Sequence, residues 1–295
     1  MQNSRAHILS SKLLAGLWFF SIISMVPGVA RCDSVEFRTI TLAYDVFIGG
    51  ILAGSTDITL HAEAAGYRIT SKARSHGFLD FLIAFRGRNE VHGIIMDGRP
   101  KPKAYNARGT LSGEVRTVAI QYGDDNRLRY QAFPNAENDH REPVPGHLLP
   151  GTTDPLSALY SALTWAARSP RCDRREAVFD GRRRYNFILR ELPGGATLGP
   201  LFSGTARVCR ARWKLLAGAS LRSWLPQFAR PEWTDIWIAT VRPDLPALPV
   251  RFQADLGYAD IVAHLVAIGG RKHPPGGKDL DAAAGSNRQT DEHSK

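Results

Sequence analysis

Apolar and polar residues alternate in short segments along the first half of the chain, between Phe37 and Phe133. A period of two residues is typical of antiparallel strands that bury one face. The sequence therefore predicts an antiparallel sheet, with turns at Gly49-Gly50, Asp97-Gly98 and Ser112-Gly113. The expected strands cover residues 41–47, 53–61, 67–73, 90–96, 104–111, 115–122 and 128–133.

One segment in the second half has the period of a helix. Thr153 or Asp154 can cap its amino end, and Pro155 suits a first helical turn. Apolar residues then recur at helical spacing, which predicts an amphipathic helix over residues 155 to about 168. Its apolar face is expected on the concave side of the sheet. Strands return at 176–180, 183–191, 206–215, 233–242, 250–256 and 261–268.

These elements predict one mainly β domain over residues 37–268. We expect a large curved antiparallel sheet, or half-open barrel, that wraps one amphipathic helix. The segment 269–295 is rich in Gly and Pro and then polar without a period. This composition predicts a disordered tail.

The amino end has the order of a secretory signal peptide. Arg5 and Lys12 give a basic start, and an uncharged apolar run over 13–26 leads to small residues that end at Ala30. This order predicts a signal peptide over 1–30 and a periplasmic mature protein without a transmembrane segment. An uncleaved membrane anchor is the alternative.

Three cysteines remain in the mature protein. Cys172 and Cys209 lie in the same β-rich carboxy-terminal region, whereas Cys32 lies at the new amino end. In an oxidising compartment we expect a disulfide between Cys172 and Cys209. A metal site is the alternative, although no CxxC or His-rich spacing supports it. Lipidation of Cys32 is not expected, because Arg31 occupies a position that needs a small residue.

The charge of the chain is positive. The whole chain carries 38 basic and 28 acidic residues, a net charge of +10, and removal of residues 1–30 leaves 36 basic residues and +8. A basic surface can meet anionic lipid, peptidoglycan or another acidic polymer. Solvated arginines are the simpler interpretation. Nucleic acid is not an expected partner, because the chain is predicted to be exported and has no recognisable binding motif.

The sequence carries no recognisable catalytic or metal-binding motif. Ser112-Gly113 and Ser203-Gly204 are only fragments of GxSxG, and both are better explained as turns. HExxH, the P-loop and a strand followed by GxGxxG do not occur, and the histidines are scattered without ligand spacing. The sequence therefore predicts no catalytic, cofactor-binding or metal-binding residue.

Residues 78–85 are almost wholly apolar. They are expected to form a short helix or bulged strand that plugs the core, since apolar residues usually lie in the core. The alternative is a mobile lip on a ligand cavity, made by Phe78, Leu79, Phe81, Leu82 and Phe85.

The string 179–185 holds three consecutive arginines after an Asp-Gly turn. Alternation places Arg182 and Arg184 on one face of the chain, where guanidinium groups can bind a phosphate or carboxylate. The alternative is that these arginines pair with carboxylates of the chain itself, such as Asp180 and Glu176.

Several residues and short strings follow one another in a characteristic order along the body of the chain. They are Tyr44 and Gly54, Gly66-Tyr67, Arg99-Pro100 with Pro102 and Tyr105, Thr153-Asp154-Pro155-Leu156-Ser157, Cys172, 179–183, Cys209 and Pro249-Val250-Arg251. In this order they resemble the bacterial envelope family catalogued as domain of unknown function 3108, from about residue 37 to 268. The resemblance implies a periplasmic protein dominated by antiparallel β structure. It supports the pairing of the two cysteines and carries no established activity.

By architecture alone, a curved sheet around a helix is similar to the lipoprotein-localisation carriers, which hold acyl chains in a half-open barrel. Our leading hypothesis is a non-enzymatic periplasmic binding or envelope-maintenance protein that holds a lipid or hydrophobic ligand between sheet and helix. One alternative is an envelope hydrolase that acts on peptidoglycan or polysaccharide. Another is a scaffold that binds a protein through four tryptophans, Trp213, Trp224, Trp233 and Trp237. The oligomeric state is left open.

Overall fold

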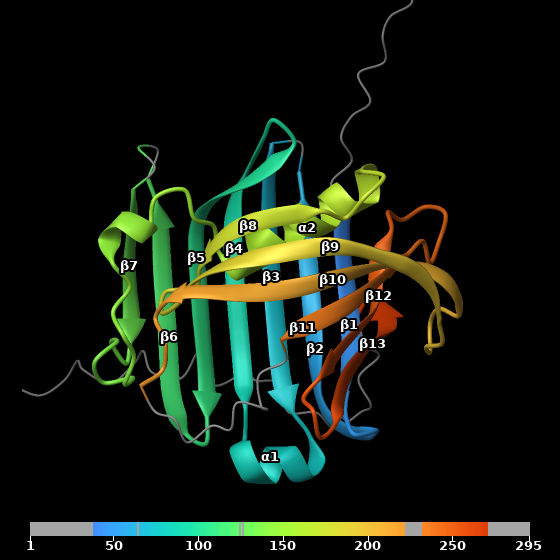
Figure 1. The fold of residues 1–295 in the computed structure, drawn as a ribbon, viewed down its shortest axis with the longest axis horizontal. Helices are drawn as coiled ribbons and strands as arrows, with labels where there is room; N and C mark the ends of the chain where they lie inside the picture. The colour runs from blue at the N-terminus through green and yellow to red at the C-terminus, as the bar shows by residue number, and fades with distance from the viewer. Residues whose placement is uncertain (1–37, 64, 124, 126, 222–231, 271–295) are drawn as a thin grey trace, which may run out of the picture. The chain divides into compact units, whose positions relative to one another are not determined.

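The computed structural model describes residues 38–270 of the chain, except 64, 124, 126 and 222–231 (Figure 1). The predicted signal peptide, Cys32, Trp224 and the tail beyond residue 270 lie outside the described residues. The described residues form one antiparallel sheet of 13 strands with two α-helices and one 3-10 helix. No helix among them is long and apolar enough to cross a membrane.

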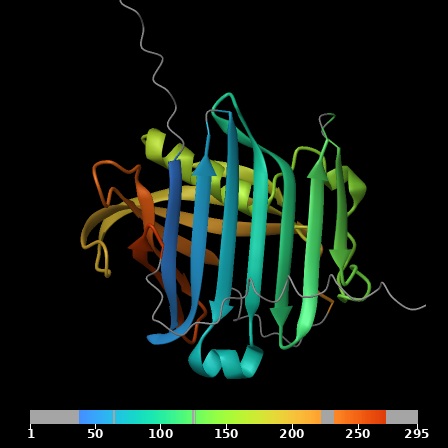
Figure 2. The ribbon, with the colours of Figure 1, turned by 180° about the vertical axis from the view of Figure 1, so that it is seen from behind.

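The first seven strands follow one another along the sheet as consecutive hairpins (Figure 2). Their inward and outward faces alternate as predicted: in the third strand Tyr67 and Ile69 are buried, while Arg68 and Lys72 are exposed. Most strands are longer than predicted, because backbone pairing continues beyond the apolar residues. Their bounds are β1 Arg38–Ile48, β2 Ile51–Ala62, β3 Gly66–Ser75, β4 Arg86–Met96, β5 Arg99–Leu111, β6 Glu114–Tyr122 and β7 Leu128–Phe133.

The later strands extend the same sheet from its other side. They are β8 Arg174–Phe179, β9 Arg184–Thr197, β10 Gly204–Ala217, β11 Trp233–Ala239, β12 Leu248–Asp255 and β13 Asp260–Ile268. Because β13 pairs with β1, the order along the sheet is β7-β6-β5-β4-β3-β2-β1-β13-β12-β11-β10-β9-β8. β7 and β8 are the two edges, so the sheet is open. The predicted large antiparallel sheet is confirmed.

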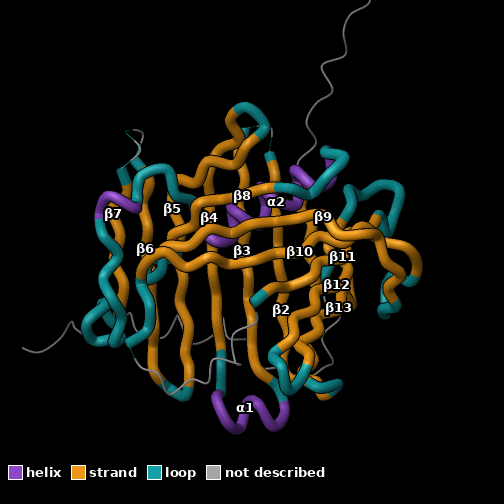
Figure 3. Tube along the Cα trace, viewed as in Figure 1, coloured by secondary structure: helices purple, strands orange, loops and turns teal. Residues whose placement is uncertain are grey.

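The predicted amphipathic helix is α2, Pro155–Arg168. It contacts β8, β5 and β4, and it lies between the face of the first strands and the strands β8 to β10 that cross in front of them (Figures 1 and 3). Asp154 caps its amino end, since its Oδ1 accepts hydrogen bonds from the backbone nitrogens of Leu156 at 3.0 Å and Ser157 at 2.9 Å.

Two apolar clusters pack around α2. On one side, Leu156 and Tyr160 of the helix pack with buried residues of β3 to β6 and with Phe179. On the other side, small helix residues allow β9 and β10 to approach closely; they are Ala158, Ala162 and Ala166. Side chains of the protein therefore occupy the layer between helix and sheet, where the sequence suggested a bound ligand.

The apolar segment 78–85 was expected to form a short helix or a bulged strand, and the structure shows a helix. Residues Gly77–Ile83 form α1 between β3 and β4, and Ala84 ends it in the left-handed conformation with φ of 35°. A helix of two turns is too short for its period to be read from sequence. From the sequence alone, a short helix and a bulged strand therefore both stayed open for this segment. A 3-10 turn covers Gly146–Leu148.

The predicted disulfide is confirmed. Cys172, just before β8, is bonded to Cys209 in β10, and both residues are fully buried. The bond ties the segment that follows α2 to β10, the third strand from the β8 edge, next to the small-residue face of the helix.

Candidate functional site

The apolar segment 78–85 projects from one end of the sheet (Figure 1). Phe78 is 73% exposed and Phe81 is 85% exposed. Of the other predicted lip residues, two are exposed and one is half-buried: Leu82, Phe85 and Leu79. The interpretation of the segment as a plug of the core is wrong, because its largest side chains face solvent. The lip of a ligand cavity stays a prediction.

Polar contacts at its base hold α1 in place. Asp80 Oδ1 accepts hydrogen bonds from Ser75 Oγ at 2.6 Å and from Arg86 Nη1 at 2.5 Å. Ser75 Oγ in turn accepts one from the backbone nitrogen of Phe85 at 2.8 Å. The hydrogen bonds from Arg86 and then Ser75 lower the pKa of Asp80 to about 2. The carboxylate is therefore ionised at neutral pH, and its hydrogen bonds hold α1 against the ends of β3 and β4.

Neighbouring turns add to the exposed apolar surface. The backbone nitrogen of His76 donates to Ala53 O at 2.8 Å, which places the β1–β2 turn beside α1. On the other side, the backbone nitrogen of Ser112 donates to Ile83 O at 2.9 Å. We call the exposed apolar residues at the start of β2, in α1 and just after α1 the apolar tip: Ile51, Leu52, Phe78, Phe81, Leu82, Ile83 and Phe85.

Three cations lie side by side on the face of the sheet opposite the tyrosines that pack on α2. Lys72 is paired in register with Arg88, and Arg88 with Arg108, so the three side chains share a face. We call these residues the cation row. Within the described part of the chain, its one ion pair joins Arg88 Nη2 to Glu90 at 3.5 Å. Like charges directly opposite one another are destabilising. The cation row therefore does not stabilise the fold, and an external anion would relieve the repulsion among its three charges.

The cation row and the apolar tip are near one another. At about 3.3 Å per strand residue, Arg88 lies about 10 Å along β4 from Phe85. Arg88 and Arg108 also line a groove of about 450 Å³ that extends across β5 and β6 to Phe133. The cation row could not be predicted from the sequence, because alternation assigns each cation to the polar face but does not give the register between strands.

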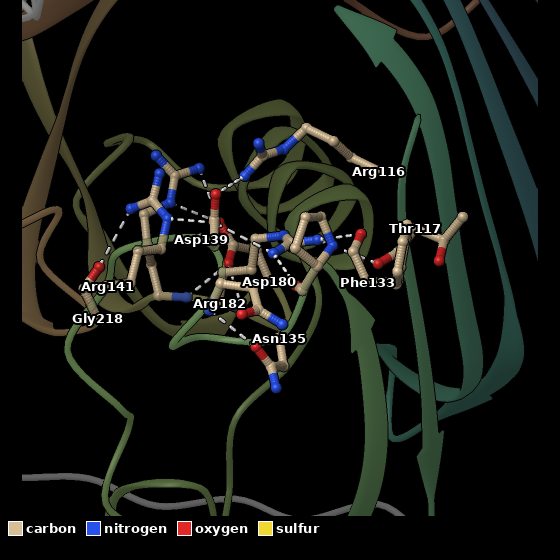
Figure 4. Close-up of polar contacts among 12 residues, drawn as sticks. Arg116, Thr117, Phe133, Asn135, Asp139, Arg141, Asp180, Arg182 and Gly218 are labelled. Carbon is tan, nitrogen blue, oxygen red and sulfur yellow. Dashed lines mark hydrogen bonds and ion pairs between the residues drawn. The ribbon is translucent and has the colours of Figure 1, made fainter. Parts of the chain in front are cut away.

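Arg182, a predicted anion-binding residue, binds acceptors of the chain itself (Figure 4). Its Nη1 donates to Asp139 Oδ2 at 3.1 Å, and its Nη2 donates to Phe133 O at 2.7 Å. Asp139 also accepts hydrogen bonds from Arg116 and Arg141. Burial opposes the ionised carboxylate, but the bonds from these arginines outweigh it and hold the pKa of Asp139 below its usual value. Arg182 thus links the β8–β9 turn to the edge strand β7 and the loop after it.

Arg184, the other predicted anion-binding residue, lies apart from this cluster. Its guanidinium donates to Leu148 O at 3.1 Å and Tyr185 O at 2.6 Å, and burial lowers its pKa. Arg183, between them, pairs with Asp180 at 2.7 Å. The protein's own acceptors therefore surround both guanidinium groups, and their binding of an external anion stays a prediction.

Asp154, the helix cap, lies in a buried polar environment that the sequence did not reveal. Its side chain is fully buried, and burial raises its pKa to about 6. Nearby, the hydroxyls of Tyr67 and Ser157 lie 2.7 Å apart. Among the described residues, Asp154 Oδ2 and the hydroxyl of Tyr122 have no hydrogen-bond partner. Since no atom of Asp154 reaches the surface, we assign it a structural role.

One group of side chains has the proximity of a metal site. Ligand atoms of Cys172, Glu191 and Cys209 lie within 4.8 Å of one another. The two sulfur atoms are bonded to each other, and Glu191 Oε2 accepts a hydrogen bond from the backbone nitrogen of Cys172 at 2.7 Å. A cysteine binds a metal ion as its thiolate, so the disulfide removes these two sulfur atoms as ligands.

Comparison of the sequence with protein-family models shows to which family the chain belongs. A family model described as a protein of unknown function (DUF3108) matches residues 43–266, most of the chain. The chain belongs to this family. The resemblance inferred from the sequence is confirmed, and the matched range of this DUF3108 protein runs from β1 to β13.

Among solved structures, the DUF3108 chain is similar to a β-barrel-like protein of domain of unknown function DUF1849 from Brucella abortus. The sequence identity is 10%, the TM-score is 0.45, and the match covers 79% of this chain and 98% of the other. No curated protein matches the chain.

Proposed function

We propose that this DUF3108 protein is a non-enzymatic periplasmic protein that docks on the surface of an anionic lipid bilayer through its apolar tip. The observation that carries the proposal is the exposure of Phe78 and Phe81 on a helix whose base is fixed by Asp80. The periplasmic location rests on the signal-peptide pattern of residues 1–30.

The exposed surface is larger than isolated apolar residues would give. Contiguous exposed apolar patches on soluble proteins usually mark an interaction site. Transfer of a phenylalanine side chain from water contributes about 1.5–3 kcal/mol. Burial of Phe78 and Phe81 in the interfacial region of a bilayer would therefore contribute roughly 4 kcal/mol.

The charges near the tip favour an anionic surface. A Lys or Arg close to anionic lipid contributes about 1 kcal/mol, so the cation row adds roughly 3 kcal/mol when all three residues reach headgroups. Long basic side chains extend toward such a surface while their stems stay on the protein. A bilayer supplies both an apolar layer and phosphates, whereas a single acyl chain supplies no array of anions.

The position of the tip favours a surface over an enclosed ligand. Side chains of the protein already occupy the layer beneath α2, and the apolar tip projects outward from the end of the sheet (Figure 1). A projecting apolar helix can enter a bilayer interface without rearrangement of the fold. Lipid therefore remains the proposed partner, as the sequence suggested. The proposed contact is the apolar tip and not the space between sheet and helix.

Flotation with lipid vesicles tests the proposal. We expect the purified protein to float with phosphatidylcholine vesicles that contain phosphatidylglycerol, less with phosphatidylcholine alone, and less as salt is raised. Equal recovery with both vesicle types would contradict the role of the cation row. Failure to float with either, or self-association through the tip in the absence of lipid, would overturn the proposal.

A further inference from the structure

A cleft of about 460 Å³ opens beside the β1–β2 turn, on strands β1, β12 and β13. Its walls combine a glycine turn, two apolar side chains and three polar ones: Gly49, Gly50, Phe47, Val262, Arg251, His264 and Asp260. Gly49 and Gly50 have positive φ, and the backbone nitrogen of Gly49 donates to Asp260 O at 3.0 Å. The turn is therefore tied to β13, and the cleft has a fixed wall.

Two buried nitrogens belong to side chains that line this cleft and lack a hydrogen-bond partner among the described residues. Arg251 and His264 are paired in register on β12 and β13, so their side chains lie next to each other on one face. Arg251 Nε and His264 Nδ1 are buried and, within the described residues, have no hydrogen-bond partner. A buried polar nitrogen without a partner destabilises a protein, so the fold itself does not satisfy the polar groups of this wall.

The guanidinium of Arg251 is held in one orientation. It lies 5.0 Å from the centre of the Trp237 ring, and its Nη2 donates to Gln253 Oε1 at 2.7 Å. In the part of the chain that the structure describes, Arg251 forms no ion pair. A planar guanidinium fixed in this way presents a pair of N–H donors that matches the two oxygens of a carboxylate.

The balance of charge limits the ligand. Burial and then the nearby Arg251 lower the pKa of His264, so its imidazole is neutral at neutral pH. Asp260 adds a carboxylate to the cleft, where its Oδ2 accepts a hydrogen bond from Gln253 Nε2 at 3.1 Å, and Asp45 is the register neighbour of His264 on β1. Repulsion by these carboxylates opposes a doubly charged phosphate more strongly than a monoanion, so an anion held by Arg251 is expected to carry a single charge.

We propose that this cleft binds a small monocarboxylate with an apolar flank. The carboxylate lies on the guanidinium of Arg251, and the apolar part lies against Phe47 and Val262. The imidazole of His264 lies next to the guanidinium and forms part of the wall of the cleft. This site is independent of lipid docking by the apolar tip, because its ligand is a free molecule and its assay contains no vesicles.

Hexanoate and its neutral isostere hexanamide are suitable probes, measured by ¹⁵N NMR of the labelled protein. The indole N–H of Trp237, assigned through Trp237→Phe, and the Nε–H of Arg251 report on the site. We expect hexanoate to shift both signals saturably and hexanamide to leave them unchanged. Absence of a shift with hexanoate, or the same shift with inorganic phosphate, would overturn the proposal, the latter because it would indicate unselective anion binding.

Substitution of the guanidinium provides the second arm. Arg251→Gln is expected to weaken hexanoate binding at least tenfold, whereas Arg212→Gln is expected to leave it unchanged. Arg212 is the matched control because it also lies over a tryptophan, 5.7 Å from the centre of the Trp233 ring, but does not line the cleft. Equal affinity in both variants would contradict the assignment. The comparison of hexanoate with hexanamide on the unsubstituted protein tests the site even if Arg251→Gln fails to fold.

Discussion

Arg182 Nη1 donates a hydrogen bond to Asp139 Oδ2 at 3.1 Å, and this contact connects the two edges of an open sheet. β7 and β8 are those edges and do not pair with each other. The same guanidinium donates to Phe133 O at the end of β7, while its own backbone follows β8 (Figure 4). A side-chain network thus joins the edges where backbone pairing does not.

Removal of the shared carboxylate is expected to destabilise this junction. Asp139 is 8% exposed at its side chain and forms ion pairs with Arg116, Arg141 and Arg182. Asp139→Asn would leave three guanidinium groups without their anion and lower the free energy of unfolding by about 3 kcal/mol. Asp244→Asn is the control, because Asp244 pairs with Arg242 at the surface and such pairs contribute about 0.5 kcal/mol. Urea unfolding measures both, and equal effects would contradict a special role for Asp139.

The turn that carries Arg182 depends on a glycine. Gly181 has φ of +88°, and a Cβ at this position would lie 2.2 Å from Val118 Cγ1. Gly181→Ala is therefore expected to lower the free energy of unfolding by more than the roughly 1–2 kcal/mol of left-handed strain alone. Gly113→Ala isolates that strain, since Gly113 has φ of +85° with nothing within 4 Å of its Cβ position. Val118→Ala should recover part of the loss in Gly181→Ala; no recovery would refute the steric account.

The stability of the protein is expected to depend on pH through Asp154. Burial raises its pKa to about 6, above the value near 3.8 expected in the unfolded chain. Its contribution to stability is therefore fully present below about pH 4 and is lost as pH rises through 6, on the order of 3 kcal/mol in total. Asp154→Asn keeps an acceptor for the backbone nitrogens of Leu156 and Ser157 but does not titrate.

Unfolding measured between pH 4 and pH 7 should thus show a smaller slope in Asp154→Asn than in the unsubstituted protein. Asp80→Asn serves as control, because the pKa of Asp80, about 2, lies outside this window. It is expected to change stability without changing the slope. A slope that persists in Asp154→Asn would show that another group titrates.

The strands themselves could be predicted from the sequence because each buries one face. Tyr67 and Ile69 alternate with Arg68 and Lys72, and this pattern is local. The pairing of β1 with β13 is not local, since it joins residues more than two hundred positions apart, and nothing in either strand encodes it. Strand existence was therefore predictable and the complete order was not.

In the candidate sites, too, local features could be predicted from the sequence and contacts between distant residues could not. Residues 78–85 were visible as an apolar run, but α1 is too short to show a helical period, and its exposure depends on the Asp80–Arg86 contact below it. Arg182 was visible as a charge, whereas its partner Asp139 is 43 positions away. Arg251 and His264 become neighbours only through strand register, so no local motif in the sequence could predict their cleft.

The disulfide is expected to contribute strongly to stability. Cys172 and Cys209 are separated by 37 positions, and closing a loop of this length restricts the unfolded chain by about 4 kcal/mol. Reduction, or the double substitution Cys172→Ala with Cys209→Ala, should lower the free energy of unfolding by about that amount. The measurement is urea unfolding with and without reductant, with the double variant insensitive to reductant. A reductant effect of equal size in that variant would point to a different cause.

The central claim, docking on lipid through the apolar tip, is tested most directly by one exposed side chain. Phe81→Ser removes an 85% exposed phenylalanine from the tip, and Leu198→Ser removes a 76% exposed leucine after β9, away from it. We expect Phe81→Ser to lower the partition coefficient onto phosphatidylglycerol-containing vesicles about 30-fold, which corresponds to about 2 kcal/mol, while Leu198→Ser changes it less than twofold. Equal binding by the two variants would contradict the account.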